Sequence, residues 1–371
     1  MFPQQLQNRL NQVKENDLFR SLKISYPQID FSSNDYLGFS SRGLLFEEIN
    51  KLVGSSKIGS TGSRLISGNS LLFQDIEQTI AQFHKADSAL IYNSGYDANI
   101  GFLSSVPQKR DLILSDELIH ASLIDGIRLS FATHYKFRHN DSSSLRDLLN
   151  RYHHSFNSIY ILVESVYSMD GDSAPLLEIV TLCKEYENVY LIVDEAHAVG
   201  VFGKNGQGMC QELNIENDCF ARIYTYGKAM GCHGAAIVGS HLLKDYLINF
   251  SRSFIYTTAM SEHSLLSIKA SYQLLHTTKE IEKLKNNILY FNDHLKKQKA
   301  FIPSNSAIHC KIASGNTQVQ ELENRLAKSN FFVKSIKSPT VKKDQERLRV
   351  CIHSFNTQED INELLNALCE R

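Results

Sequence analysis

The sequence predicts an α/β fold with a mainly parallel sheet, followed by a smaller α+β region. In the middle of the chain, short β-branched runs alternate with amphipathic ones, which is the rhythm of strand and helix units. The runs 159–164 (IYILVE) and 189–194 (VYLIVD) are apolar at successive positions, as expected of strands that are buried on both faces. From about residue 262 the pattern changes to a long helical stretch followed by strand-like pieces.

The elements follow in order along the chain. The candidate strands of the sheet are Ser88–Tyr92, Asp111–Ser115, Ile159–Glu164, Val189–Asp194, Ile223–Tyr226 and Ala235–Gly239. Apolar residues recur at helical spacing over 72–83, and again over 145–152 behind the expected cap Ser142. Near the carboxyl terminus, strands are expected within 307–313, 331–337 and 347–354, and a last helix at Gln358–Cys369. We therefore expect an amino-terminal helix and arm at 1–40, a large α/β domain at 41–262 and a carboxyl-terminal α+β domain at 263–371.

Composition restricts the class of protein. The 371 residues include 39 basic and 40 acidic side chains, so the formal net charge is −1. This balance gives no general affinity for nucleic acid or an anionic membrane. The first turn is polar and no eighteen apolar residues run together, so we expect a cytoplasmic protein. The 7 cysteines include no CxxC pair, which argues against a disulfide framework and a structural zinc site, and we expect no metal.

Polar residues follow several predicted strands, at the edge where open α/β sheets bind ligands. Ser94, Gly95 and Tyr96 open a helix, whose free N–H groups would suit a phosphate. A glycine before a helix is common, however, so this feature alone is weak. Asp194 ends a buried strand, and an isolated buried charge is costly, so this carboxylate needs a partner. A protonated heteroaromatic nitrogen would be such a partner.

Lys228 lies just beyond another predicted strand, in the segment 227–231 (GKAMG). Most lysines are solvated surface residues, but this one accompanies Asp194, a histidine after a strand (His120) and a glycine-containing helix start. A lysine for a Schiff base, an acid for a pyridinium nitrogen and a phosphate cup are the parts that a pyridoxal phosphate enzyme needs. The segment 194–197 also spells the DEAH motif of helicases, but the chain has no Gly-Lys-Ser/Thr phosphate loop to accompany it.

These motifs resemble the α-oxoamine synthases, a family with the aspartate-aminotransferase-like fold (fold type I) of pyridoxal phosphate enzymes. The resemblance runs from 31–38 (FSSNDYLG) through 59–69 (GSTGSRLISGN) and 168–176 (SMDGDSAPL) to 338–341 (SPTV). It implies a mainly parallel seven-stranded sheet in the large domain and a homodimer with composite active sites. It also implies an acyltransferase with pyridoxal 5'-phosphate bound covalently to Lys228.

The resemblance further implies a decarboxylative condensation in biotin biosynthesis. L-alanine would react with a pimeloyl thioester of CoA or of a transiently bound acyl carrier protein, releasing CO₂ and the thiol carrier. The alternative is a sister synthase that uses glycine or serine with another acyl-CoA, such as 2-amino-3-oxobutyrate CoA ligase, aminolevulinate synthase or serine palmitoyltransferase. One methyl group gives a pocket only about 1 to 3 kcal/mol of discrimination, so the sequence leaves this choice open. An inactive scaffolding relative would not need the retained set of Lys228, Asp194, His120 and His197.

The roles of single residues also follow from the resemblance. Lys228, His120 and Asp194 are the expected catalytic residues. The expected cofactor-binding residues are Gly95, Tyr96, His120, Ser168, Asp194, His197, Thr225, Lys228, Thr257 and Thr258, the last two reaching the phosphate of the neighbouring subunit. The expected substrate-binding residues are Arg20, Asn34, Thr340 and Arg349, with the fork of Arg349 on the amino-acid carboxylate. The chain departs from the family at residues 26–27, where relatives carry an extra strand, and at Lys337, where they usually have arginine.

Overall fold

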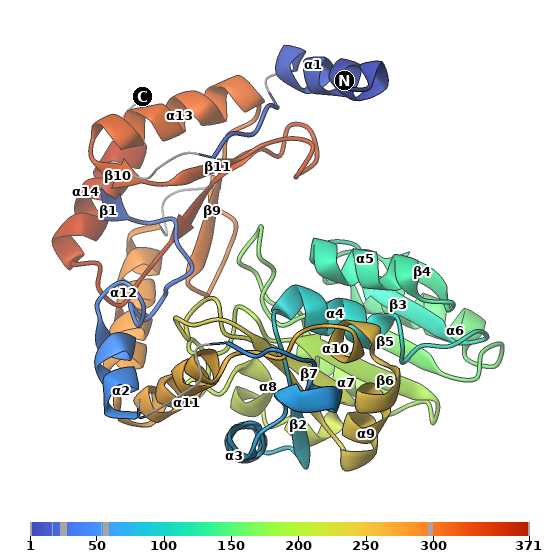
Figure 1. Ribbon diagram of the computed structural model, residues 1–371. Coiled ribbons are helices and arrows are strands. Elements are labelled where there is room, and N and C mark those ends of the chain that lie inside the picture. The colour runs from blue at the N-terminus through green and yellow to red at the C-terminus, as the bar shows by residue number, and fades with distance from the viewer. Residues whose placement is uncertain are drawn as a thin grey trace.

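The computed structural model describes residues 2–16, 18–22, 28–52, 54, 59–295 and 300–369. Residues 26 and 27, where the sequence departs from its relatives, lie outside this range. The predicted α/β fold is confirmed: the main sheet has seven strands in the order β2-β8-β7-β6-β5-β3-β4. All neighbouring pairs are parallel except those of β8, which runs antiparallel to β2 and β7. Figure 1 shows this sheet with helices packed on both of its faces.

The strands of the main sheet are β2 (Ser88–Tyr92), β3 (Leu112–Asp116), β4 (Thr133–Phe137), β5 (Ile159–Glu164), β6 (Val189–Asp194), β7 (Ala221–Thr225) and β8 (Ala235–Gly239). The predicted strands are all present, although β3 starts and ends one residue later than expected and β7 starts two residues earlier. The edge strand β4 was missed, because most of its side chains are exposed or half-buried and it carries no apolar run.

The helices around this sheet are α3 (Leu71–Phe83), α4 (Gly95–Leu103), α5 (Ala121–Leu129), α6 (Ser142–Tyr152), α7 (Leu176–Cys183), α8 (Met209–Glu212), α9 (His241–Phe250), α10 (Arg252–Ile255) and α11 (Glu262–Thr277), with the short turns η1 (Arg64–Gly68) and η2 (Glu216–Asp218). Alternate strand residues enter two separate cores, as Ile113 does on the side of α4 and α5, and Leu114 on the side of α6 and α7. The expected cap Ser142 was wrong. It is the first residue of α6, and the Asp141 side chain caps the helix by accepting from the Ser144 N–H at 2.8 Å.

Two small sheets form the rest of the fold. β9 (Ile308–Ile312), β11 (Lys334–Ile336) and β12 (Arg347–Cys351) make an antiparallel sheet, and β1 (Ile29–Asp30) pairs in parallel with β10 (Phe331–Phe332). The accompanying helices are α1 (Gln4–Glu15), α2 (Leu44–Leu52), α12 (Glu280–Leu295), α13 (Asn316–Lys328) and α14 (Gln358–Cys369). The pairing of β1 with β10 means that the amino-terminal arm is hydrogen-bonded to the carboxyl-terminal region (Figure 1).

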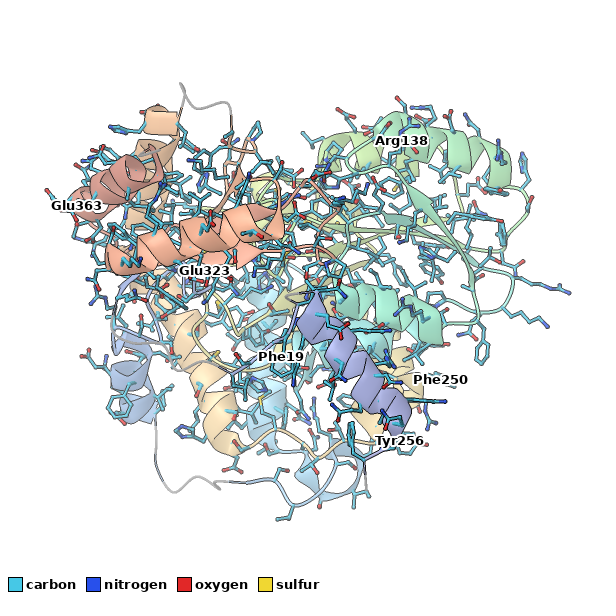
Figure 2. The ribbon with its side chains drawn as sticks, turned by 90° about the horizontal axis from the view of Figure 1, so that it is seen from above. Phe19, Arg138, Phe250, Tyr256, Glu323 and Glu363 are labelled. Carbon is cyan, nitrogen blue, oxygen red and sulfur yellow. The ribbon has the colours of Figure 1, made fainter. Side chains whose placement is uncertain are left out.

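The first helix, α1, has no buried residue. Figure 2 shows it across the outside of the molecule, with Phe19 next to it. Among the described helices, none has both the length and the apolar character needed to cross a membrane.

Candidate active site

A cavity of about 270 Å³ opens beyond the carboxyl ends of the parallel strands, where the sequence predicted a ligand site. We call it the inner cavity. The predicted site residues that line it are Asn34, Gly95, Tyr96, His120, Asp194, Thr225 and Lys228. Four of these segments, at 95–96, 120, 194 and 225–228, meet as expected because they lie at or after the ends of strands that share one sheet edge, and Asn34 joins them from the amino-terminal arm.

One end of the inner cavity is the start of α4. The Ser94 hydroxyl caps this helix by accepting from the Asp97 N–H at 3.1 Å. As the first residues of the helix, Gly95 and Tyr96 have N–H groups without an intrahelical acceptor. A Cβ atom on Gly95 would lie 2.4 Å from Cγ2 of Thr225, so a larger residue would fill this cradle. The buried Thr225 Oγ1 has no hydrogen-bond partner among the described residues. Such a site fits an anion that accepts several hydrogen bonds.

Asp194 is a buried carboxylate in the wall of the same cavity. Its Oδ1 accepts from the Ala196 N–H at 2.9 Å, and its Oδ2 accepts from Asn99 Nδ2 at 3.0 Å. Glu164 lies opposite Asp194 in the β5–β6 register. Burial, and then the Asp194 charge, raise the pKa of Glu164 well above its ordinary value, which favours the neutral form of Glu164. Of these two neighbouring acids, Asp194 is therefore the candidate partner for a cationic ring nitrogen.

Lys228 and His120 face this cavity with altered proton affinities. Burial lowers the pKa of Lys228 to about 8, although the charge of Asp194 opposes the shift. More of this amine is therefore neutral at pH 7 than in an ordinary lysine, as a base or nucleophile requires. Burial also lowers the pKa of His120. His120 Nδ1 accepts from the Ser122 N–H at 3.2 Å, so the neutral ring carries its proton on Nε2.

His197, Tyr36 and Arg349 form a layer behind the inner cavity. The Tyr36 hydroxyl lies 2.8 Å from His197 Nδ1 and 3.1 Å from Asn34 Oδ1. Arg349 donates through Nη2 to the same Asn34 oxygen at 3.0 Å and through Nε to the Ser168 carbonyl at 2.7 Å. Tyr36 thus joins His197 to Asn34, and Asn34 in turn binds Arg349. Tyr36 was not predicted, although it lies inside the 31–38 motif.

A larger cavity of about 600 Å³ adjoins the inner one, and we call it the outer cavity. Its walls come from the segments 117–121, 167–170 and 338–343. Ser168 and Thr340 line the outer cavity and not the inner one, whereas His120 lines both. The two cavities therefore meet at His120.

Besides His197 and Arg349, three predicted residues line neither cavity. Arg20 is exposed on the segment after α1 and lines neither cavity. Asn93 Nδ2 donates to Thr257 Oγ1 at 3.1 Å and to the Thr258 carbonyl at 2.9 Å. These two threonines therefore lie beside the carboxyl end of β2. Their predicted contact is with a neighbouring subunit, and it stays a prediction.

Comparisons with known proteins show the family of the chain. The family model for aminotransferase class I and II matches residues 26–368. An 8-amino-7-oxononanoate synthase from Emericella nidulans is 41% identical over 92% of this chain and 88% of its own length. The solved 8-amino-7-oxononanoate synthase from Francisella tularensis is 30% identical, with a TM-score of 0.80 over 92% of this chain and 96% of that one. A serine palmitoyltransferase from Sphingomonas wittichii, 24% identical, has the same fold, with a TM-score of 0.88 over 98% and 95% of the two chains.

The chain therefore belongs to the aminotransferase class I and II family, whose fold is type I. The resemblance to the α-oxoamine synthases is confirmed, and within that group the relatives of this chain are 8-amino-7-oxononanoate synthases, which are acyltransferases.

Proposed function

We propose that this enzyme condenses L-alanine with a pimeloyl thioester to form 8-amino-7-oxononanoate in biotin biosynthesis. The reaction would release CO₂ and the thiol carrier, which is CoA or acyl carrier protein. The observation that carries the proposal is the meeting of two cavities at His120: the inner one is lined by Lys228 and Asp194, and the outer one has room for an acyl chain. The relatives named as 8-amino-7-oxononanoate synthases support it.

The inner cavity fits pyridoxal 5'-phosphate, which we propose as its cofactor. The start of α4 and the unpartnered Thr225 hydroxyl would hold the phosphate, and Asp194 would hold the ring nitrogen. Lys228 would carry the group covalently, and His197 would lie beside its phenolic oxygen. When bound, the cofactor supplies an electron-withdrawing ring that stabilises negative charge on the substrate carbon.

The remaining steps belong to residues of the chain. The guanidinium of Arg349, which Ser168 and Asn34 already orient, would bind the alanine carboxylate. The Lys228 amine, with its pKa of about 8, would remove the α-proton and return it after the condensation. His120 carries a proton on Nε2 at the junction of the cavities, so it would donate a hydrogen bond to the acyl carbonyl oxygen.

We place the acyl thioester in the outer cavity. Thr340 lines this cavity together with Lys342 and Lys343, so polar and cationic contacts are available to the anionic end of a pimeloyl chain. We also propose a homodimer, in which Thr257 and Thr258 reach the phosphate of the partner's site, and the division of the chain at about residues 40 and 262.

A sister synthase that uses glycine or serine is the second candidate. The serine palmitoyltransferase likeness favours it, but at 24% identity that likeness concerns the fold alone. The test is an assay that pairs alanine, glycine and serine with pimeloyl, acetyl, succinyl and palmitoyl thioesters, followed by the mass of each product. We expect CO₂ and the 8-amino-7-oxononanoate mass from alanine with the pimeloyl thioester. Faster turnover of any other pair would overturn the assignment.

A further inference from the structure

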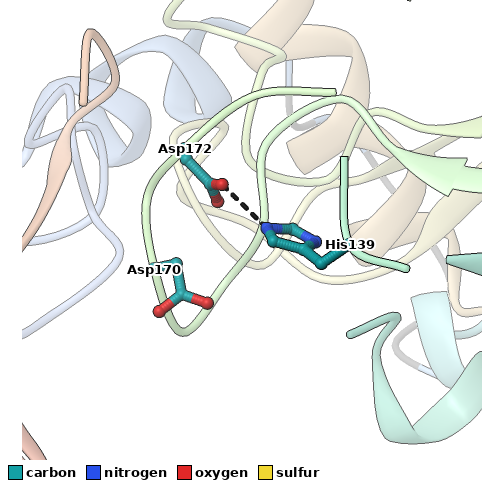
Figure 3. Close-up of side chains that lie close together, drawn as sticks. All are labelled: His139, Asp170 and Asp172. Atoms are coloured by element: carbon teal, nitrogen blue, oxygen red, sulfur yellow. Dashed lines mark hydrogen bonds and ion pairs between the residues drawn. The ribbon is translucent and has the colours of Figure 1, made fainter. Parts of the chain in front are cut away.

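His139, outside both cavities, lies between two carboxylates. Its Nδ1 is 2.9 Å from Asp116 Oδ1 at the end of β3. Its Nε2 is 2.8 Å from Asp172 Oδ2, and Figure 3 shows this second contact. Its ring also packs edge-on against Tyr167, with 4.5 Å between centroids. Only an imidazolium can donate from both nitrogens, so the geometry is that of a charged histidine with two acceptors.

Further hydrogen bonds and an ion pair surround this arrangement. Asp116 also accepts from the Asn140 N–H at 2.9 Å, and Asn140 Nδ2 donates to Asp172 at 2.8 Å. Asp170 lies in the same group, but it forms an ion pair with Arg347 of β12. His139, Asp170 and Asp172 are close enough to surround a metal ion, yet each carboxylate already has a cationic partner. The groups that face His139 are thus Asp116 from β3, Asp172, Asp170 and Tyr167 from one loop, and Arg347 behind Asp170.

The loop that His139 contacts, residues 167–172, is also held on its far side. We call it the clamp loop. The carboxyl-terminal region is hydrogen-bonded to its main chain: the Gly171 carbonyl accepts from Ser304 Oγ at 2.7 Å and from Ser306 Oγ at 2.8 Å. Gly171 has a φ of +79°, and a Cβ there would lie 2.1 Å from the Ile308 carbonyl oxygen. The loop therefore has little room to shift toward β9, and His139 restrains it from the opposite side.

The clamp loop is also a wall of the outer cavity, which its residues 167–170 line. We propose that His139 is a positioning residue: by bridging Asp116 and Asp172 it fixes the clamp loop and so sets how tightly the outer cavity binds the acyl thioester. Arg349 touches the loop at Ser168 but is also held by Asn34 and by Cys351 Sγ at 3.0 Å. Binding of the amino acid should therefore depend less on His139 than binding of the acyl substrate.

The test compares His139→Gln with the matched control His154→Gln, which replaces an exposed histidine after α6. Hydrogen exchange of residues 166–173 in the full-length holoenzyme at pH 7 reports on the loop without any assumption about the reaction. Because His139→Gln removes a hydrogen bond between a charged ring and the loop, we expect at least about tenfold faster exchange in this variant. The control should match the wild type.

Kinetics form the second arm, which rests on the proposed function. In His139→Gln the KM for the pimeloyl thioester should rise about tenfold, while the dissociation constant of alanine changes less than about twofold. Asp172→Asn keeps the His139 ring and should reproduce both the faster hydrogen exchange and the higher KM for the pimeloyl thioester. This second variant keeps the proposal testable if His139→Gln does not fold. The double variant should be no worse than either single one if His139 acts through Asp172.

The outcomes separate the two proposals. A wild-type enzyme that makes no product from alanine and the pimeloyl thioester contradicts the proposed function. The hydrogen-exchange measurement still tests whether His139 fixes the clamp loop. Wild-type exchange rates over 166–173 in both His139→Gln and Asp172→Asn overturn the positioning role. Faster exchange with an unchanged KM for the acyl thioester likewise overturns the claim that the loop sets acyl binding.

Discussion

The inner and outer cavities meet at one histidine but are built in different ways. The inner cavity is formed largely by side chains at or after the ends of strands of one sheet; Asp194 is buried in its wall and Lys228 is half-buried. The outer cavity is walled mainly by loops from two regions of the chain, 167–170 and 338–343. The sheet fixes the groups that need exact placement for bond making and breaking, whereas loops can vary to select a substrate. Substitutions in the two cavities should therefore differ in kind as well as in size.

The largest expected effect is in the inner cavity, at Lys228. Lys228→Ala removes both the attachment point of the cofactor and the base, so turnover should fall by at least about 10⁴-fold. Product formation under saturating substrates measures this loss, and borohydride should no longer fix a chromophore to the chain. Lys204→Ala, an exposed lysine in the other Gly-Lys pair, is the matched control and should keep full activity. Substantial turnover in Lys228→Ala would refute the role of this residue.

Asp194→Asn should have the next largest effect. The amide keeps a similar shape and one acceptor oxygen, but it cannot balance a cationic ring nitrogen, so we expect kcat to fall about 10²- to 10³-fold at full cofactor occupancy. The loss of the carboxylate should also lower the pKa of Lys228 further below about 8, because the Asp194 charge opposes the effect of burial. The pH dependence of lysine acylation in the cofactor-free protein measures that shift. A kcat within tenfold of the wild type would contradict the proposed role.

The part of the fold that could be predicted from the sequence is the part with a local signal. Continuous apolar runs such as 159–164 and 189–194 gave β5 and β6 with their observed bounds, because strands buried on both faces need such runs. The strand β4 has no such run, since it lies at the sheet edge with exposed side chains. The pairing of β1 with β10 joins residues about 300 positions apart, and no local pattern records it.

The same distinction holds for the candidate site. Gly95, Asp194 and Lys228 could be found because each lies at the end of a strand or within three residues of it, and the structure brings them to one cavity. Glu164 also ends a strand, and it lies opposite Asp194. The two residues are neighbours only because β5 and β6 are adjacent in the sheet, and the sequence leaves this strand order open. His139 was missed because it follows the strand that was missed. Arg20 was expected at the site from the resemblance, but the arm on which it lies is exposed.

A smaller effect is expected at Arg349, in the layer behind the inner cavity. Arg349→Lys keeps the charge but loses the planar fork, so it cannot contact Asn34, Ser168 and a carboxylate together. The dissociation constant of alanine, followed by the absorbance of the bound cofactor, should rise about 10- to 100-fold. The KM for the acyl thioester should change much less, the reverse of the pattern expected for His139→Gln. Equal effects on both substrates would show that the cavities are not separate in function.

The smallest expected effect concerns the wall of the outer cavity and its dependence on pH. Burial lowers the pKa of His139, but its hydrogen bonds to Asp116 and Asp172 outweigh burial and raise it to about 9, from 6.5 in the unfolded chain. Because the folded state binds this proton more tightly, the stabilisation is complete below about pH 6.5 and is lost as the pH rises through about 9. Urea unfolding of wild type and His139→Gln at one protein concentration should give a free-energy gap that shrinks by about 1 to 3 kcal/mol between pH 6.5 and 10. His154→Gln should show no such change, and a gap for His139→Gln that is constant over this range would mean that the ring is held as a neutral group.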